Sequence, residues 1–133
     1  MKLFERIAYA HCDIPCGIYD PKPAQIAAAT VLKMVQKIVA IKDSTEVNDR
    51  NDFIRMVWTK EEHARKCKEE VLILWTDYFK PEHFEKYPDL TDKVLKTCKL
   101  CSENKQHVSE EKANELVKAV DEIAHIFAET KKS

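Results

Sequence analysis

The chain has 133 residues, of which 44% are hydrophobic and 34% are charged, with a single glycine and a formal net charge of −1. This length predicts one domain, and the composition excludes a disordered chain and favours a helix-rich one. Since the charge is nearly balanced and no basic run carries interleaved aromatics, we expect no nucleic-acid partner. No apolar run reaches the roughly 18 residues that a membrane span needs, so we expect no membrane insertion.

The first ten residues, MKLFERIAYA, end in a small-x-small pattern at Ala8 and Ala10. An export signal also needs an apolar segment of about 7 to 15 residues, and Glu5 and Arg6 interrupt the apolar run here. We therefore interpret residues 1–10 as a short non-secretory leader. The five cysteines, an odd number, fit a reducing compartment better than a disulfide framework, which predicts a cytoplasmic protein.

Apolar residues then recur at three- and four-residue spacings, which predicts amphipathic helices. The first helix is expected to begin at Asp20 and Pro21, a cap followed by a proline in the first turn, and to run to about Asp43. Polar residues 45–51 predict a loop. A second and longest helix is expected to end before Pro81. The apolar positions of these two helices are Ile26, Val31, Met34, Val35, Ile38, Ile41, Phe53, Val57, Ala64, Cys67, Val71, Leu74, Trp75 and Tyr78.

Residues 79–90 hold two prolines among aromatic and charged residues, which predicts a packed connection with Asp89 as its exit cap. A short third helix follows, and Ser109 with two glutamates predicts the start of a fourth. The apolar positions of these two helices are Leu90, Val94, Leu95, Cys98, Cys101, Ala113, Leu116, Val120, Ile123, Ala124 and Phe127. Without a strand pattern, residues 22–133 predict an all-α four-helix bundle.

Residues 11–21, HCDIPCGIYDP, place two thiols, an imidazole, two prolines and the only glycine before the first helix. We call this segment the hook. Cys12 and Cys16 could be small core side chains, but Pro15 and Gly17 leave no periodicity that would bury them. A disulfide across so short a loop is disfavoured in a reducing compartment. Metal binding or redox chemistry is therefore the favoured interpretation.

Cys98 and Cys101 form a C-x2-C pair, which could join Cys12 and Cys16 in a closed four-thiolate zinc site. Because Cys98 and Cys101 also lie on the apolar stripe of the third helix, core packing explains them equally well. Spacing alone leaves both interpretations open.

The hook resembles the nickel-binding segment of the nickel-type superoxide dismutases. Three further blocks resemble the same family, namely LWTDYFKP at 74–81, HFEKYP at 83–88 and IFAETKK at 126–132. The resemblance implies a four-helix bundle assembled as a homohexamer, with one nickel ion per subunit. It also implies that superoxide is the substrate and is converted to dioxygen and hydrogen peroxide by Ni(III)/Ni(II) cycling.

The resemblance further implies that a maturation peptidase cuts between Ala10 and His11, which leaves a single domain of residues 11–133. In that family the new α-amine of His11, the backbone nitrogen of Cys12 and the thiolates of Cys12 and Cys16 form a square-planar set. The His11 imidazole is the implied axial ligand. We therefore expect the full-length chain to be inactive.

Other residues take implied roles around this metal set. Tyr19 matches a tyrosine that stands over the open metal face and controls anion approach. Asp13 and Pro15 match positions that hold the shape of the hook, although both are also ordinary turn residues. Tyr78 matches a supporting tyrosine behind the hook, although its helical position also fits a core side chain.

The sequence departs from the family at two supporting positions. A glutamate on the first helix and an arginine on the second, which the family uses to hold the axial histidine, correspond to Ala27 and His63. The Ile18 carbonyl is a remaining candidate partner. Lys22, Lys80 and Lys86 are candidates for guiding an anion. The alternative function is a non-enzymatic helical protein that chelates nickel or copper at its N-terminus.

Overall fold

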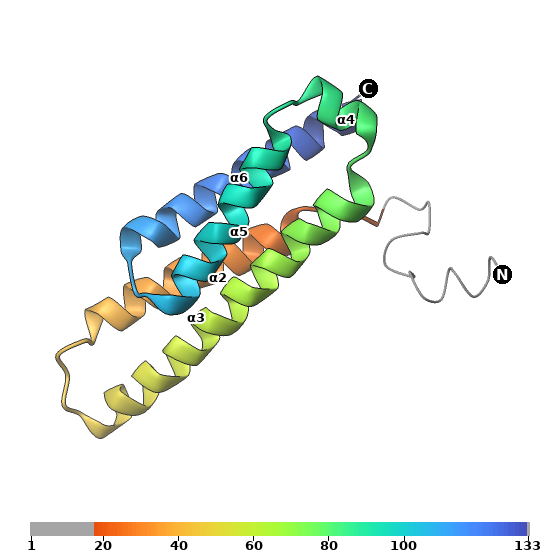
Figure 1. Ribbon diagram of the computed structural model, residues 1–133. Coiled ribbons are helices and arrows are strands. Elements are labelled where there is room, and N and C mark those ends of the chain that lie inside the picture. The colour runs from red at the N-terminus through yellow and green to blue at the C-terminus, as the bar shows by residue number, and fades with distance from the viewer. Residues whose placement is uncertain (1–17, 133) are drawn as a thin grey trace.

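The computed structural model describes residues 18–132, and every regular element in that range is helical (Figure 1). The elements are α2 (Lys22–Ala40), α3 (Val47–Ile73), the π-helix η1 (Leu74–Tyr78), α4 (Pro81–Lys86), α5 (Leu90–Gln106) and α6 (Glu110–Lys132). The four long helices run alternately in opposite directions, and both α2 and α5 pack against α3 and α6. This confirms the predicted four-helix bundle, to which the short α4 is added.

Each long helix buries one apolar stripe, and the four stripes meet in a single core. On α2 the stripe includes Ala24, Ala27 and Ala28, each at most 1% exposed. Their small side chains let α3 approach so closely that the Cys67 thiol lies 3.6 Å from the Ala24 carbonyl oxygen. Two predicted core positions are wrong, because Ile26 is 55% and Leu95 54% exposed.

The helix boundaries differ from the prediction in three places. Pro21 is the N-cap of α2, while the Asp20 carboxylate accepts a hydrogen bond from the Lys22 amide at 2.8 Å. α3 begins at Val47, so the predicted loop at 45–51 is mostly helical. Ser44 donates to the Asp49 carboxylate at 2.7 Å, which ties the first turn of α3 to the shorter loop before it. α5 continues past Cys101 to Gln106.

The α4 connection carries the chain between α3 and α5 at one end of the bundle. Ser109 caps α6 as predicted, because its hydroxyl accepts the Lys112 amide at 3.2 Å. Asp89 occupies the N-cap position of α5 but makes no side-chain capping bond. Within residues 18–132 we find no helix whose length and hydrophobicity would let it span a bilayer.

Lys60 is a lysine buried inside the bundle, with 1% of its surface exposed. Its Nζ donates to the backbone carbonyls of Asn104, Lys105 and His107, the last two at 3.0 and 3.2 Å. These carbonyls lie at the C-terminal end of α5, where the helix dipole is negative and the last carbonyls lack helical partners. Burial lowers the pKa of Lys60, and the nearby Glu61 opposes this effect. A lysine of α3 thus fixes the point at which α5 ends.

We expect Lys60→Met to lower the free energy of unfolding by about 2 to 4 kcal/mol, because it removes a charged donor from three carbonyls. Urea unfolding at one fixed protein concentration measures this loss. Lys66→Met, at an exposed position of the same helix, is the matched control and should change stability by at most about 0.5 kcal/mol. Equal losses in the two variants would contradict the capping role.

Candidate functional site

Five predicted site residues, namely His11, Cys12, Asp13, Pro15 and Cys16, lie outside the described residues. The structure does describe the end of the bundle at which the chain leaves the hook. There the segment before α2 lies near η1, and the C-terminal turns of α6 lie at the same end (Figure 1). Tyr19 and Tyr78, the two predicted tyrosines, meet at this end, with ring centroids 5.7 Å apart.

Tyr78 is the centre of an aromatic cluster. Its ring lies 4.5 Å from the ring of Phe127 and 5.2 Å from that of Phe79, measured between centroids. Its hydroxyl lies 2.8 Å from the Thr130 hydroxyl, which donates to the Phe127 carbonyl at 2.6 Å. Because the one hydroxyl hydrogen of Thr130 is used in that bond, Tyr78 is the donor to Thr130. The ring of Tyr78 therefore has a fixed position beneath Tyr19.

The π-helix η1 sets the direction in which Tyr78 points. At its end the Phe79 amide donates to the Leu74 carbonyl at 2.9 Å, which closes a five-residue turn in place of a four-residue one. Such wide turns are rare and are frequent at functional sites. Pro81 then holds Lys80 extended, with φ −111° and ψ 165°, because a residue before proline avoids the helical region. The chain therefore turns away directly after Tyr78.

His83 stacks on the ring of Tyr78. The two rings are stacked with 12° between their planes and 5.8 Å between their centroids. The His83 Nδ1 atom accepts the Lys80 amide at 3.0 Å. This hydrogen bond holds the first turn of α4 in place.

Positive charge also lies at this cluster. The Nζ of Lys131 is 5.1 Å from the centroid of the Tyr78 ring and 5.4 Å from that of Phe127, within the range of cation–π attraction. Lys22 and Lys80 are exposed, and Lys86 lies over the ring of Tyr87 at 5.7 Å. A small anion that approaches this end therefore meets several ammonium groups, of which Lys131 is in contact with the aromatic cluster.

Spacing in the sequence does not identify Thr130, Lys131 or His83 as neighbours of the tyrosines. Thr130 follows Phe127 by three residues, which places both on one face of a helix, but only the packing of α6 brings them to Tyr78. His83 is part of the HFEKYP block, yet its contact with Tyr78 depends on the turn after η1.

The cysteines of α5 are part of the core. Cys101 is fully buried and Cys98 is half-buried, and both are free thiols, as is Cys67. A hydrogen bond with Cys101, together with burial, raises the pKa of Cys67, and burial raises the pKa of Cys98. Metal-bound cysteines must be thiolates, so these shifts oppose metal binding. Within residues 18–132 no group of three or more potential ligands is placed to hold a metal ion.

Cys101 is also remote along the bundle from the end at which the chain leaves the hook and enters α2. It lies eleven residues after Leu90, which corresponds to about 16 Å along the helix at 1.5 Å per residue. This position and the burial support the core interpretation of the C-x2-C pair over the zinc interpretation.

Ala27 and His63, the two departures from the resemblance, have ordinary structural roles. Ala27 is buried in the core and has no side chain that could accept a hydrogen bond. His63 is half-buried, and its Nδ1 lies 2.9 Å from the Thr59 carbonyl oxygen one turn earlier in α3. Neither residue can act as a carboxylate that orients an imidazole, so such support would have to come from another group.

Comparison with known proteins gives one consistent family. Residues 6–131 match the model of the family described as nickel-containing superoxide dismutase. The chain is 42% identical to the superoxide dismutase [Ni] of Streptomyces coelicolor and 40% identical to that of Streptomyces seoulensis, in each case over 93% of this chain and 90% of the relative.

A solved structure of a Ni-containing superoxide dismutase, in the state after partial X-ray-induced reduction, has the same fold. It superposes with a TM-score of 0.81 at 36% identity, and the match covers 92% of this chain and 100% of that one.

We expect Tyr78→Phe to lower the free energy of unfolding by about 0.5 to 1.5 kcal/mol, because it removes the hydroxyl that donates to Thr130 but keeps the ring. Tyr87→Phe is the matched control, since the Tyr87 hydroxyl makes no hydrogen bond among residues 18–132. Thermal or urea unfolding compares the two. A loss in the control as large as that in Tyr78→Phe would contradict the fixed hydroxyl.

We expect Cys98→Ala combined with Cys101→Ala to leave the bound metal per chain unchanged, because both thiols belong to the core. Elemental analysis measures the metal, and circular dichroism checks that the helices persist. Cys12→Ala is the control that should lose the metal. If the double variant loses it instead, the zinc interpretation is correct.

Proposed function

Because the chain belongs to the nickel-containing superoxide dismutase family, we propose that the hook is its nickel site and that the aromatic cluster around Tyr78 supports that hook. Membership defines the enzyme class, an oxidoreductase that acts on superoxide, and nickel as the cofactor. The observation that carries the proposal is that the family match spans residues 6–131 and so includes the whole hook.

The donors of the hook fit nickel chemically. Thiolates and nitrogen atoms in a planar set are donors that Ni(II) accepts, whereas hard cations prefer oxygen. We propose that the α-amine and imidazole of His11, the backbone nitrogen of Cys12 and the thiolates of Cys12 and Cys16 hold one nickel ion per subunit. Asp13 and Pro15 would keep the segment in the required turn.

When bound, nickel would supply the Ni(III)/Ni(II) couple that oxidises one superoxide to dioxygen and reduces another, which takes up two protons from water, to hydrogen peroxide. The side chains of the protein would position the hook and attract the anionic substrate. Tyr19, half-buried over Tyr78, would stand at the entrance to the hook, and its ring contact with Tyr78 would restrict its movement. Tyr78 would act as a positioning residue, because its own hydroxyl is bonded to Thr130.

Lysines at the same end would attract the substrate. Superoxide is a small anion, and positive charge near a site raises the local concentration of anions and their rate of arrival. Lys131 supports this role best, since its contact with the Tyr78 and Phe127 rings holds its charge beside the cluster. Lys22, Lys80 and Lys86 would add to the attraction from exposed or ring-covered positions.

Maturation would create the site. A peptidase that cuts between Ala10 and His11 would free the α-amine that completes the proposed equatorial set. We also propose that the mature chain, residues 11–133, assembles as a homohexamer. A cytoplasmic location is proposed as well, and the free thiols of Cys67, Cys98 and Cys101 support it.

The test compares three forms of the chain that begin at Met1, Ala10 and His11. We expect only the form that begins at His11 to bind about one nickel per subunit and to dismutate superoxide. The form that begins at Ala10 is the matched control, because one extra residue converts the His11 amine into a peptide nitrogen. Elemental analysis gives the metal, and a superoxide assay gives the activity.

Two results would overturn the proposal. Equal dismutation by all three forms would show that the His11 amine is not a ligand. Full occupancy by zinc without dismutation, in the form that begins at His11, would show that the hook is not a nickel redox site.

A further inference from the structure

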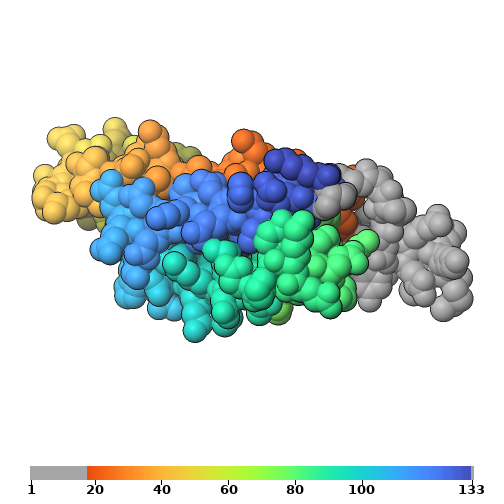
Figure 2. All heavy atoms as spheres, turned by 90° about the horizontal axis from the view of Figure 1, so that it is seen from above, coloured from red at the N-terminus to blue at the C-terminus, as the bar shows by residue number. Residues whose placement is uncertain are grey.

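The N-terminal half of α3 carries large apolar side chains that are exposed to solvent. Val47 is 77%, Ile54 69% and Trp58 70% exposed, and the first buried residue of the helix is Lys60. This half lies at the end of the bundle opposite Tyr78, where the α2–α3 pair reaches beyond the turn between α5 and α6 (Figures 1 and 2). No element within residues 18–132 covers this apolar face.

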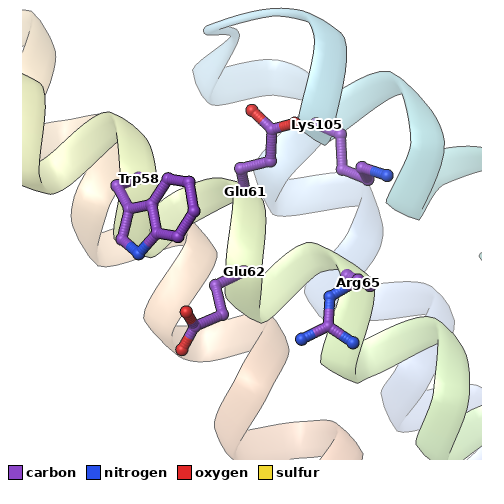
Figure 3. Close-up of a pocket in the computed structure, with 5 residues that line it drawn as sticks. All are labelled: Trp58, Glu61, Glu62, Arg65 and Lys105. Atoms are coloured by element: carbon purple, nitrogen blue, oxygen red, sulfur yellow. The ribbon is translucent and has the colours of Figure 1, made fainter.

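Helix geometry places these side chains on one stripe. At about 100° per residue, Val47 and Ile54 lie within about 40° of Trp58 around the helix axis. Charged residues flank the stripe, with Arg55 and Glu62 on one side of it and Glu61 on the other. Figure 3 shows Glu61 and Glu62 on opposite sides of the line from Trp58 to Arg65.

A hollow continues the stripe toward the middle of α3. It measures about 230 Å³ and is lined by Trp58, Glu61, Glu62, Arg65 and Lys105 (Figure 3). Two glutamates beside an exposed indole suit a partner that brings a cation and an apolar side chain together. Arg55, one turn before Trp58 on the same chain, is such a cation and forms no ion pair among residues 18–132.

This face of α3 is therefore complementary to the same face of a second copy of the chain. Large exposed apolar patches mark interaction sites, and tryptophan and arginine are the side chains that most often dominate interface energies. We propose that this stripe of α3 docks antiparallel against the same stripe of a second copy of the chain, about a two-fold axis at Trp58.

Such an axis fixes which residues meet. A residue that follows Trp58 by some number of positions lies level with the residue that precedes Trp58 by that number in the second copy. The two indoles then meet at the centre. Arg55 lies beside Glu62 of the second copy, since both occupy the same side of the stripe at nearly the same level. The pairing occurs twice, so opposite charges meet on both copies.

This inference rests on the homo-oligomer proposed above, for which it names one contact, and it does not depend on nickel. Breaking the contact in a hexamer should leave smaller assemblies. The described start of the chain, at residues 18–21, lies at the opposite end of the bundle from this stripe, so metal content and the α3 contact can be measured separately.

The experiment measures the assembly mass of the mature chain by light scattering for wild type, Trp58→Ala, Arg55→Glu, Glu62→Arg and the double variant Arg55→Glu/Glu62→Arg. We expect the three single variants to have a lower mass than wild type and the double variant to regain it, because the reversed charges pair again. Leu95→Ala, which changes a side chain 54% exposed on α5, is the matched control and should keep the wild-type mass.

Circular dichroism confirms that each variant is folded. If Trp58→Ala and Arg55→Glu keep the wild-type mass, the α3 contact is wrong while the proposed assembly stands. A monomeric wild type overturns both, and nickel-dependent dismutation in that monomer would leave the proposed chemistry intact. Loss of mass in the single variants without recovery in the double variant would overturn the antiparallel pairing.

Discussion

The buried ammonium of Lys60 determines where the bundle is complete and where it is not. Its Nζ donates hydrogen bonds to three carbonyls at the end of α5, and this places the turn between α5 and α6 level with the middle of α3. Towards Tyr78 from that level, four helices share one core. In the other direction only α2 and α3 continue, and Val47, Ile54 and Trp58 of α3 are exposed there. Lys60 thus lies at the boundary between two ends of the bundle. At the closed end four helices share a core, and at the open end only α2 and α3 are present.

At the closed end several elements hold Tyr78 in a fixed position. The wide turn of η1 directs Tyr78 inward, α6 supplies the hydroxyl of Thr130 and the ring of Phe127, and α4 supplies the ring of His83. Three elements therefore hold one tyrosine on which Tyr19 rests. The proposed hook would supply its metal donors from a few consecutive residues, and such a platform would offset part of the entropy lost when so short a segment is held in one shape.

The sequence predicts the helices well because apolar residues spaced three and four positions apart lie on one face of a helix, and that face is the one that is buried. The sequence also predicts the hook, because its proposed donors are neighbours in the chain, but those donors lie outside the described residues. Ile26 and Leu95 fit the same spacing yet are exposed, since only the neighbouring helices decide which edge of a stripe is covered. Lysine is ordinarily a surface residue, and the burial of Lys60 depends on backbone carbonyls 44 to 47 residues later in the chain. Tyr78 could be placed on a helix but not in a π-turn, since that turn depends on tertiary packing.

The contacts of Tyr78 with Phe127 and Thr130 have a consequence for the order of events in the cell. The proposed ligands of the hook are made early during synthesis, whereas Phe127 and Thr130, which fix Tyr78, follow them by more than 100 residues. The platform therefore cannot form until α6 has been synthesised. Metal that binds the proposed hook before that point would bind it without the support of Tyr78.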